Sequence, residues 1–151
     1  MANARRASVK RQDLASIGER CTCLALRSAA RTVARIYDEA LRSVALNNGQ
    51  FSILVAVSAM QPVSIQGLGE RLGMDRTTVT AALKPLQRRA LIVIDIAEDD
   101  LRGRCVSLTP VGRKLLKRAV PLWEKAQESI ALLLGGEASA FDIRNKLAAI
   151  H

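Results

Sequence analysis

The segment from Ser64 to Thr109 constrains the fold of this chain more than any other part of its sequence. Two short amphipathic helices are expected there in close succession. Ser64 is a favourable N-cap for the first helix, which ends at Gly73, and Asp75 is a favourable N-cap for the second, where its carboxylate can accept the Thr78 backbone N–H. A first helix, a tight turn and a second helix therefore follow one another within 25 residues or so of chain.

The pattern then changes from a helical period to β-branched runs at 91–96 and 105–108. A polar, charged stretch at 97–104 separates these runs, which predicts a hairpin with an exposed tip. Helix, turn, helix and hairpin in this order are typical of a winged helix-turn-helix. The expected fold class is thus mainly α with a small β-hairpin wing (α+β): a winged helix-turn-helix lobe plus a helical region.

Helical patterns flank this lobe on both sides. One continuous helix is expected from Asp13 to about residue 46, with two apolar faces that need two partners, and a second helix from about Gln50 to Met60. Thr109 and Pro110 predict the start of a long helix that runs to about Leu134, before a last short helix. We expect one domain, with a basic arm at about 1–12, helical dimerisation segments at 13–46 and 110–151, and the winged lobe at 47–109.

The charge of the chain indicates a polyanionic partner. Its 23 Lys and Arg residues exceed its 14 Asp and Glu residues, which gives a net charge of +9. DNA or RNA is the first interpretation and an acidic membrane surface the second, while a merely basic soluble protein is the plain alternative. Eleven of the 23 basic residues fall between 71 and 118, where a winged lobe would meet DNA.

The second short helix and the wing supply the candidate DNA contacts. In a helix-turn-helix the second helix presents its polar side to base edges in the major groove, and basic side chains of a wing reach the flanking backbone or minor groove. Taken singly, each of these residues is more simply explained as part of a solvated face, and Arg102 as a partner of Asp100. The predicted DNA-binding residues are Arg76, Thr77, Thr78, Thr80, Lys84, Arg88, Arg102 and Arg104.

At these positions the sequence resembles the MarR family of bacterial transcriptional regulators. The stretches that carry the resemblance are LGERLGMDRTTVT at 68–80, LKPLQRR at 83–89, DLR at 100–102 and VSLTPVG at 106–112. The resemblance implies a triangular homodimer that reads a palindromic double-stranded DNA operator, usually as a repressor released by a ligand or an oxidant. Two departures weaken any inference about the operator: Ala81 stands where many relatives have Arg, and Ala90 where they have Gly.

The segment from Cys23 to Leu26 resembles the part of the peroxide-sensing branch of the family that holds its reactive cysteine. In that branch tyrosines stabilise the thiolate, whereas here Arg27 stands at one such position, and an arginine lowers a thiol pKa. The plainer interpretation is that Cys21 and Cys23 are small residues packed in a helix interface. A metal site at Cys21 and Cys23 is disfavoured because the two side chains diverge on a helix, and Cys105 is not an obvious resolving partner.

Two classes of input therefore stay open: a small-molecule effector in a pocket lined by Tyr37 and Trp123, or oxidation of Cys23. An enzyme is disfavoured, because the chain has no internal His, no Gly-rich phosphate loop and no Ser/His/Asp set, and no cofactor or metal is expected. A non-specific architectural DNA-binding protein remains the better alternative. The apolar runs are too short to span a bilayer, and the odd, unpatterned cysteines suggest a cytoplasmic protein with reduced thiols.

Overall fold

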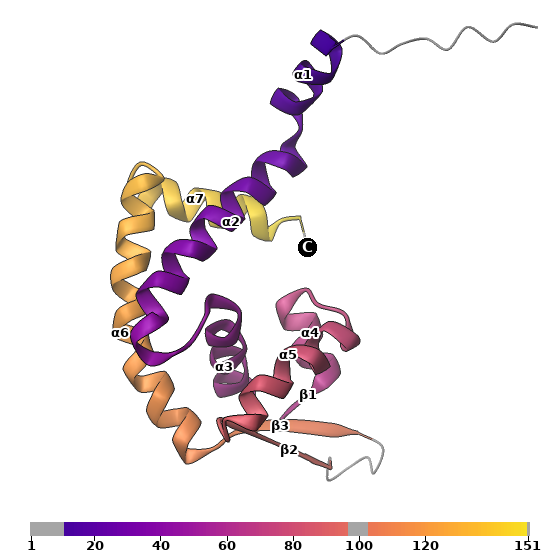
Figure 1. The fold of residues 1–151 in the computed structure, drawn as a ribbon, viewed down its shortest axis with the longest axis vertical. Helices are drawn as coiled ribbons and strands as arrows, with labels where there is room; N and C mark the ends of the chain where they lie inside the picture. Colours follow the sequence, from indigo (N-terminus) through magenta and orange to yellow (C-terminus); the bar gives the residue numbers. More distant parts are fainter. Residues whose placement is uncertain (1–10, 97–102, 151) are drawn as a thin grey trace, which may run out of the picture. The chain divides into compact units, whose positions relative to one another are not determined.

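The computed structural model describes residues 11–96 and 103–150, and the chain divides after Ala34 into two compact units. The first unit contains α1 (Arg11–Arg20) and the first part of α2 (Thr22–Leu41) (Figure 1). The expectation of one continuous helix from Asp13 to residue 46 is wrong, because the helix is interrupted at Cys21. There the Cys21 sulfur accepts the backbone N–H of Leu24 at 3.4 Å, as an N-cap side chain does, and a new helix begins.

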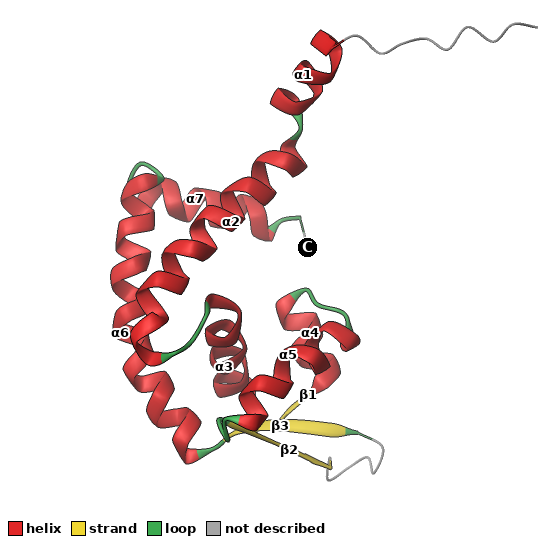
Figure 2. Cartoon of the chain, viewed as in Figure 1, coloured by secondary structure: helices red, strands yellow, loops and turns green. Residues whose placement is uncertain are grey.

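The second unit contains the end of α2 and all later elements (Figure 2). In chain order they are η1 (Arg42–Val44), α3 (Asn48–Met60), β1 (Val63–Ser64), α4 (Ile65–Leu72), α5 (Arg76–Arg88), β2 (Ile92–Ile96), β3 (Arg104–Leu108), α6 (Pro110–Leu133) and α7 (Glu137–Ala148). A mainly helical chain with a small sheet is confirmed. None of the helices described is both long and apolar enough to cross a membrane.

The sheet has one more strand than the predicted hairpin. Its order is β1–β3–β2 and both pairings are antiparallel, with Ile92 opposite Leu108 and Ile96 opposite Arg104. Strand β1 is only two residues long and joins the outer edge of β3, where Ser64 lies opposite Cys105. A two-residue strand has no periodicity of its own, so the sequence pattern could not reveal it.

The predicted helix starts are confirmed at three places. Ser64 Oγ accepts the Gly67 N–H at 3.0 Å, Asp75 Oδ1 accepts the Thr78 N–H at 2.9 Å, and Thr109 Oγ1 accepts the Gly112 N–H at 2.9 Å. The helix expected from Gln50 begins two residues earlier at Asn48. The reason is a capping box, in which the side chains of Asn47 and Gln50 each accept the other residue's backbone N–H.

One apolar core fills the second unit beneath the two short helices. Leu68 of α4, Val79 and Leu86 of α5 and Val106 of β3 are fully buried, and they pack with the buried side of α3. The end of α6 and helix α7 differ, since apolar side chains there are largely exposed to solvent. Leu132 is 77 % exposed, Leu133 73 % and Phe141 58 %, and Ile150, just after α7, is 71 % exposed.

Candidate nucleic-acid interface

Helix α5 has one buried side and one polar side. Val79, Leu83 and Leu86 face the core and are at most 1 % exposed, which fixes how the helix is rotated about its axis. The exposed residues Arg76, Thr80, Lys84 and Arg88 recur every four positions on the outward side. The core thus orients a polar stripe towards solvent along the whole helix.

The turn between α4 and α5 is shaped by two glycines. Gly73 ends α4 in the left-handed conformation at φ 64°, which an L-residue rarely adopts. A Cβ on Gly69 would lie 2.7 Å from the Met74 carbonyl oxygen, so only glycine lets the turn approach α4 this closely. These two positions set the spacing between α4 and α5.

The N-terminus of α5 is held by a doubly bonded carboxylate. Asp75 accepts the Thr78 backbone N–H at 2.9 Å and the Thr78 hydroxyl at 2.6 Å. These two hydrogen bonds, the side-chain one foremost, lower the pKa of Asp75, so the cap is ionised at neutral pH. The Thr78 hydroxyl is therefore committed to the cap, while the Thr80 hydroxyl donates to the Arg76 carbonyl oxygen at 2.8 Å.

The cations of the outward side are available to an external partner. Arg76, Lys84 and Arg88 are exposed and form no ion pair within residues 11–96 and 103–150. Thr77 is likewise exposed. A basic side chain without an internal partner, on a helix of fixed orientation, is suited to bind phosphate or a base edge.

The wing contributes one predicted residue to the described structure. Arg104 is exposed and begins β3, opposite Ile96. Arg102 lies outside the described residues, as does Asp100, its alternative partner. The strand is anchored at its other end, where the Leu108 N–H donates to Gln61 Oε1 at 2.8 Å. The sequence did not single out Gln61, because its partner is 47 residues away.

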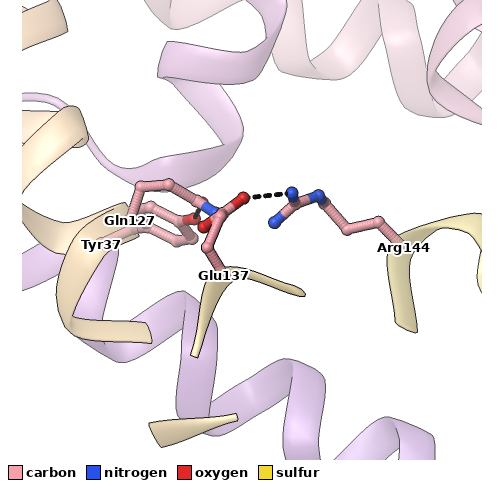
Figure 3. A network of polar contacts seen from close by, with 4 residues as sticks. All are labelled: Tyr37, Gln127, Glu137 and Arg144. Atoms are coloured by element: carbon pink, nitrogen blue, oxygen red, sulfur yellow. Dashed lines mark hydrogen bonds and ion pairs between the residues drawn. The ribbon is translucent and has the colours of Figure 1, made fainter. Parts of the chain in front are cut away.

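Tyr37 and Trp123, the predicted effector residues, meet in an aromatic stack. The two rings lie 6.3 Å apart at 7°, and Phe51 stacks on Trp123 at 6.1 Å, so α2, α3 and α6 are joined. The Tyr37 hydroxyl donates to Gln127 Oε1 at 2.5 Å, close to the Arg144–Glu137 ion pair (Figure 3). Burial raises the pKa of Tyr37, and the Arg144 charge partly opposes the rise.

A cavity of about 230 Å³ opens beside Trp123. Phe51, Ser52 and Val55 of α3 line it, together with Arg71 from the last turn of α4. It therefore combines two aromatic faces with a hydroxyl and a cation. The sequence pattern did not identify Phe51 or Arg71 as site residues, because no local pattern shows that residues of α3, α4 and α6 lie next to one another.

The cysteines are spread over both units. Cys23 and Arg27 lie on the exposed surface of α2 in the first unit, and Cys21 is partly exposed. Cys105 is partly exposed on β3, in the second unit. Within the part of the chain described, no three His, Cys, Asp or Glu side chains lie together as metal ligands would.

Comparison with known proteins identifies this arrangement. The model of the MarR family matches residues 46–103. The crystal structure of the M. tuberculosis transcriptional regulator MosR in complex with DNA is 34 % identical in sequence and has a TM-score of 0.77, with 86 % of this chain and 92 % of that chain covered. The chain belongs to the MarR family.

Two further MarR-fold relatives carry information about inputs. The organic hydroperoxide resistance transcriptional regulator of Bacillus subtilis is 27 % identical over 100 residues, which are 66 % of this chain and 68 % of that protein. BpsR of Bordetella bronchiseptica, whose DNA binding is regulated by 6-hydroxynicotinic acid, is 25 % identical with a TM-score of 0.77, covering 87 % of this chain and 94 % of that chain. The chain is thus similar both to a peroxide-response regulator and to a ligand-response regulator.

Proposed function

We propose that this chain is a sequence-specific transcriptional regulator that reads a palindromic double-stranded DNA operator as a homodimer. The observation that carries the proposal is the exposed polar stripe of α5, which has Arg76, Lys84 and Arg88 without internal partners. MosR, the relative of 34 % identity, was crystallised with DNA. In this proposal Arg76, Thr77 and Thr80 meet base edges, while Lys84, Arg88, Arg102 and Arg104 meet phosphates.

In the same proposal, residues 47–109 form the DNA-reading lobe, and residues 13–46 and 110–151 form the dimer contacts. Support comes from the exposed apolar side chains at the end of α6 and on α7, such as Leu133 and Phe141. An apolar surface of this kind is typical of a protein–protein interface. A two-fold dimer of winged lobes matches the symmetry of a palindromic operator.

The test is selection of duplexes from a random library, followed by titration of the selected duplex and a scrambled one at the same salt concentration. We expect the selected sequences to be palindromic and bound about a thousandfold or more tightly than the scrambled one. Equal affinity for both would favour a non-specific architectural protein instead. Absence of binding to any duplex at low salt would contradict the proposal entirely.

We further propose that the regulator is a repressor and that a small aromatic acid releases it. The cavity beside Trp123, at about 230 Å³, is below the common range of ligand pockets, roughly 300–1,000 Å³, and suits a single ring. Arg71 supplies the positive charge for a carboxylate.

Trp123 is the only Trp of the chain, so its fluorescence reports on titration with 6-hydroxynicotinic acid as a probe. Arg71→Met should weaken any binding seen, and an unchanged affinity would exclude Arg71 from the site.

A second candidate is a thiol-based switch at Cys23, favoured by the exposure of that side chain on α2 and by similarity to a hydroperoxide resistance regulator. The Cys23 thiolate would attack the hydroperoxide, which cleaves the O–O bond and leaves a sulfenic acid and an alcohol. Mass spectrometry and DNA binding are measured after one equivalent of cumene hydroperoxide. Unchanged DNA binding by protein oxidised at Cys23, or equal loss in Cys23→Ser, would exclude this input.

We also propose that the protein works in the cytoplasm and without catalysis. The support is its family membership, since MarR-family regulators are generally not enzymes, and operator DNA lies in the cytoplasm of bacteria.

A further inference from the structure

Two adjacent arginines at the end of α5 are both exposed but differ in their hydrogen-bond partners. Arg88 is exposed and makes no hydrogen bond or ion pair within the described residues. Arg89, the C-cap of α5, donates from Nη1 to the backbone carbonyl oxygen of Ala45 at 2.6 Å. The two residues are 44 positions apart, so this hydrogen bond ties the end of α5 to a distant part of the chain.

Ala45 lies in the short connection between α2 and α3. It is the C-cap of η1 and has the left-handed φ of 53°, a conformation that costs free energy in an alanine and persists only where neighbours hold it. Helix α3, which follows this connection, is bonded to α2 at its first residue, because Asp38 Oδ1 of α2 accepts the Asn48 backbone N–H at 2.6 Å. The connection is therefore bonded to α2 at its end and to α5 at Ala45.

The end of α5 is also bonded to the beginning of α6. Ala90, which has a φ of 53°, accepts the Thr109 hydroxyl at 2.7 Å through its carbonyl oxygen, and Thr109 is the N-cap of α6. The C-cap of α5 and the residue after it thus make hydrogen bonds to both connections that lead out of the winged lobe. One leads to α2 and the other to α6.

We propose that Arg89 is a positioning residue that sets the direction of α5 relative to the α2–α3 connection, without itself touching DNA. The inference rests on the proposed function. In a symmetric dimer, the direction of α5 in each copy sets the separation of the two reading helices, which must match the half-site spacing of the operator. A charged guanidinium donor makes a stronger hydrogen bond to a carbonyl than a neutral donor does, so Arg89 suits this position.

The test compares Arg89→Met with Arg88→Met, because both changes remove one charge and its donors and keep an unbranched apolar stem. Amide hydrogen exchange is measured first, without DNA, at Leu46 and Asn48. Arg89→Met should accelerate exchange there by about tenfold, the change expected for loss of one charged hydrogen bond. Arg88→Met should leave it unchanged, and Arg89→Lys should restore most of the protection.

Operator binding is then measured across salt concentrations for the same variants. Arg89→Met should weaken binding at every salt concentration with the slope of log K against log salt unchanged. Arg88→Met should lower the magnitude of that slope by about 0.9, the value for one phosphate contact. If Arg89→Met lowers the slope as Arg88→Met does, or if exchange at Leu46 and Asn48 is unaffected, the positioning role is wrong. Wild-type protein that binds no duplex overturns the proposed function itself.

Discussion

The winged lobe, residues 47–109, and the C-terminal helices α6 and α7 differ in how far their apolar side chains are buried. In the lobe, Leu68, Val79 and Leu86 are completely buried, and the outward side of α5 is polar. At the end of α6, by contrast, Leu132 and Leu133 are 77 % and 73 % exposed. Most large apolar side chains of the lobe are buried, whereas several at the end of α6 and on α7 face solvent.

The difference shows how each region meets its partner. The lobe packs its core within the chain, together with Leu116 and Ala119 of α6, and its partner is recognised through charge and hydrogen bonds. The C-terminal helices expose apolar area that a second copy of the chain would remove from water. Changes in the two regions should therefore have separable effects, on folding and DNA recognition in one and on assembly in the other.

The largest effect, on dimer formation, is expected from substitutions in the C-terminal helices. Leu133→Glu combined with Phe141→Glu should convert the dimer to a monomer, because each buried side chain contributes about 1.5–3 kcal/mol and each occurs in both copies. Light scattering coupled to gel filtration measures the mass. Val93→Glu, the control, changes a residue of the lobe that is 41 % exposed and should leave a dimer. A dimer that survives the double substitution would remove α6 and α7 from the interface.

The next largest effect is expected in the core of the lobe. Leu83→Ala on α5 should lower the free energy of unfolding by about 2–5 kcal/mol, because it leaves a cavity at a fully packed position. Val93→Ala should change it by only about 0.5 kcal/mol or less. Urea denaturation at one fixed protein concentration measures both. Equal effects would mean that the core of the lobe is not what holds α5.

A smaller effect is expected on the reading face. Arg76→Ala or Thr80→Ala should reduce discrimination between operator and scrambled duplex by about 1–3 kcal/mol, the contribution of one base contact. Arg104→Ala should instead weaken both complexes and lower the salt slope by about one unit. Fluorescence anisotropy at several salt concentrations separates these outcomes. A uniform loss for Arg76 and Thr80 would assign them to the phosphate backbone.

The smallest effect concerns the cap of α5. The lowered pKa of Asp75 means that its carboxylate stabilises the fold fully above its unfolded value, about 3.9, and loses this effect as the pH falls through the folded pKa. The stability difference between wild type and Asp75→Asn should therefore be constant near neutrality and shrink below about pH 4. Urea denaturation across pH measures it. A difference independent of pH would mean that the charge of Asp75 does not contribute.

The sequence predicted the parts of the fold that depend on local signals. Ser64, Asp75 and Thr109 could be identified as N-caps because a cap needs only its own residue and the next turn. The exposed side of α5 followed from its helical period in the same way. The order of the elements was sufficient to predict the winged lobe.

The structural features that the sequence did not predict depend mostly on contacts between residues far apart in the chain. The hydrogen bonds from Arg89 to Ala45 and from Leu108 to Gln61 join positions 44 and 47 apart, and no local pattern marks them. The break at Cys21 was missed because the apolar period continues across it. Arg89 directly follows Arg88 and was not among the predicted site residues, because only the folded chain brings it to the Ala45 carbonyl oxygen.

In the proposed complex the outward side of α5 occupies the major groove twice in each symmetric particle. A hydroxyl-radical footprint of the dimer on its selected operator should therefore show two equivalent protected regions on one face of the duplex, with centres about one helical turn or a whole number of turns apart. One continuous, unpatterned region of protection, or a single asymmetric half-site, would show that two α5 helices do not occupy the groove in this way.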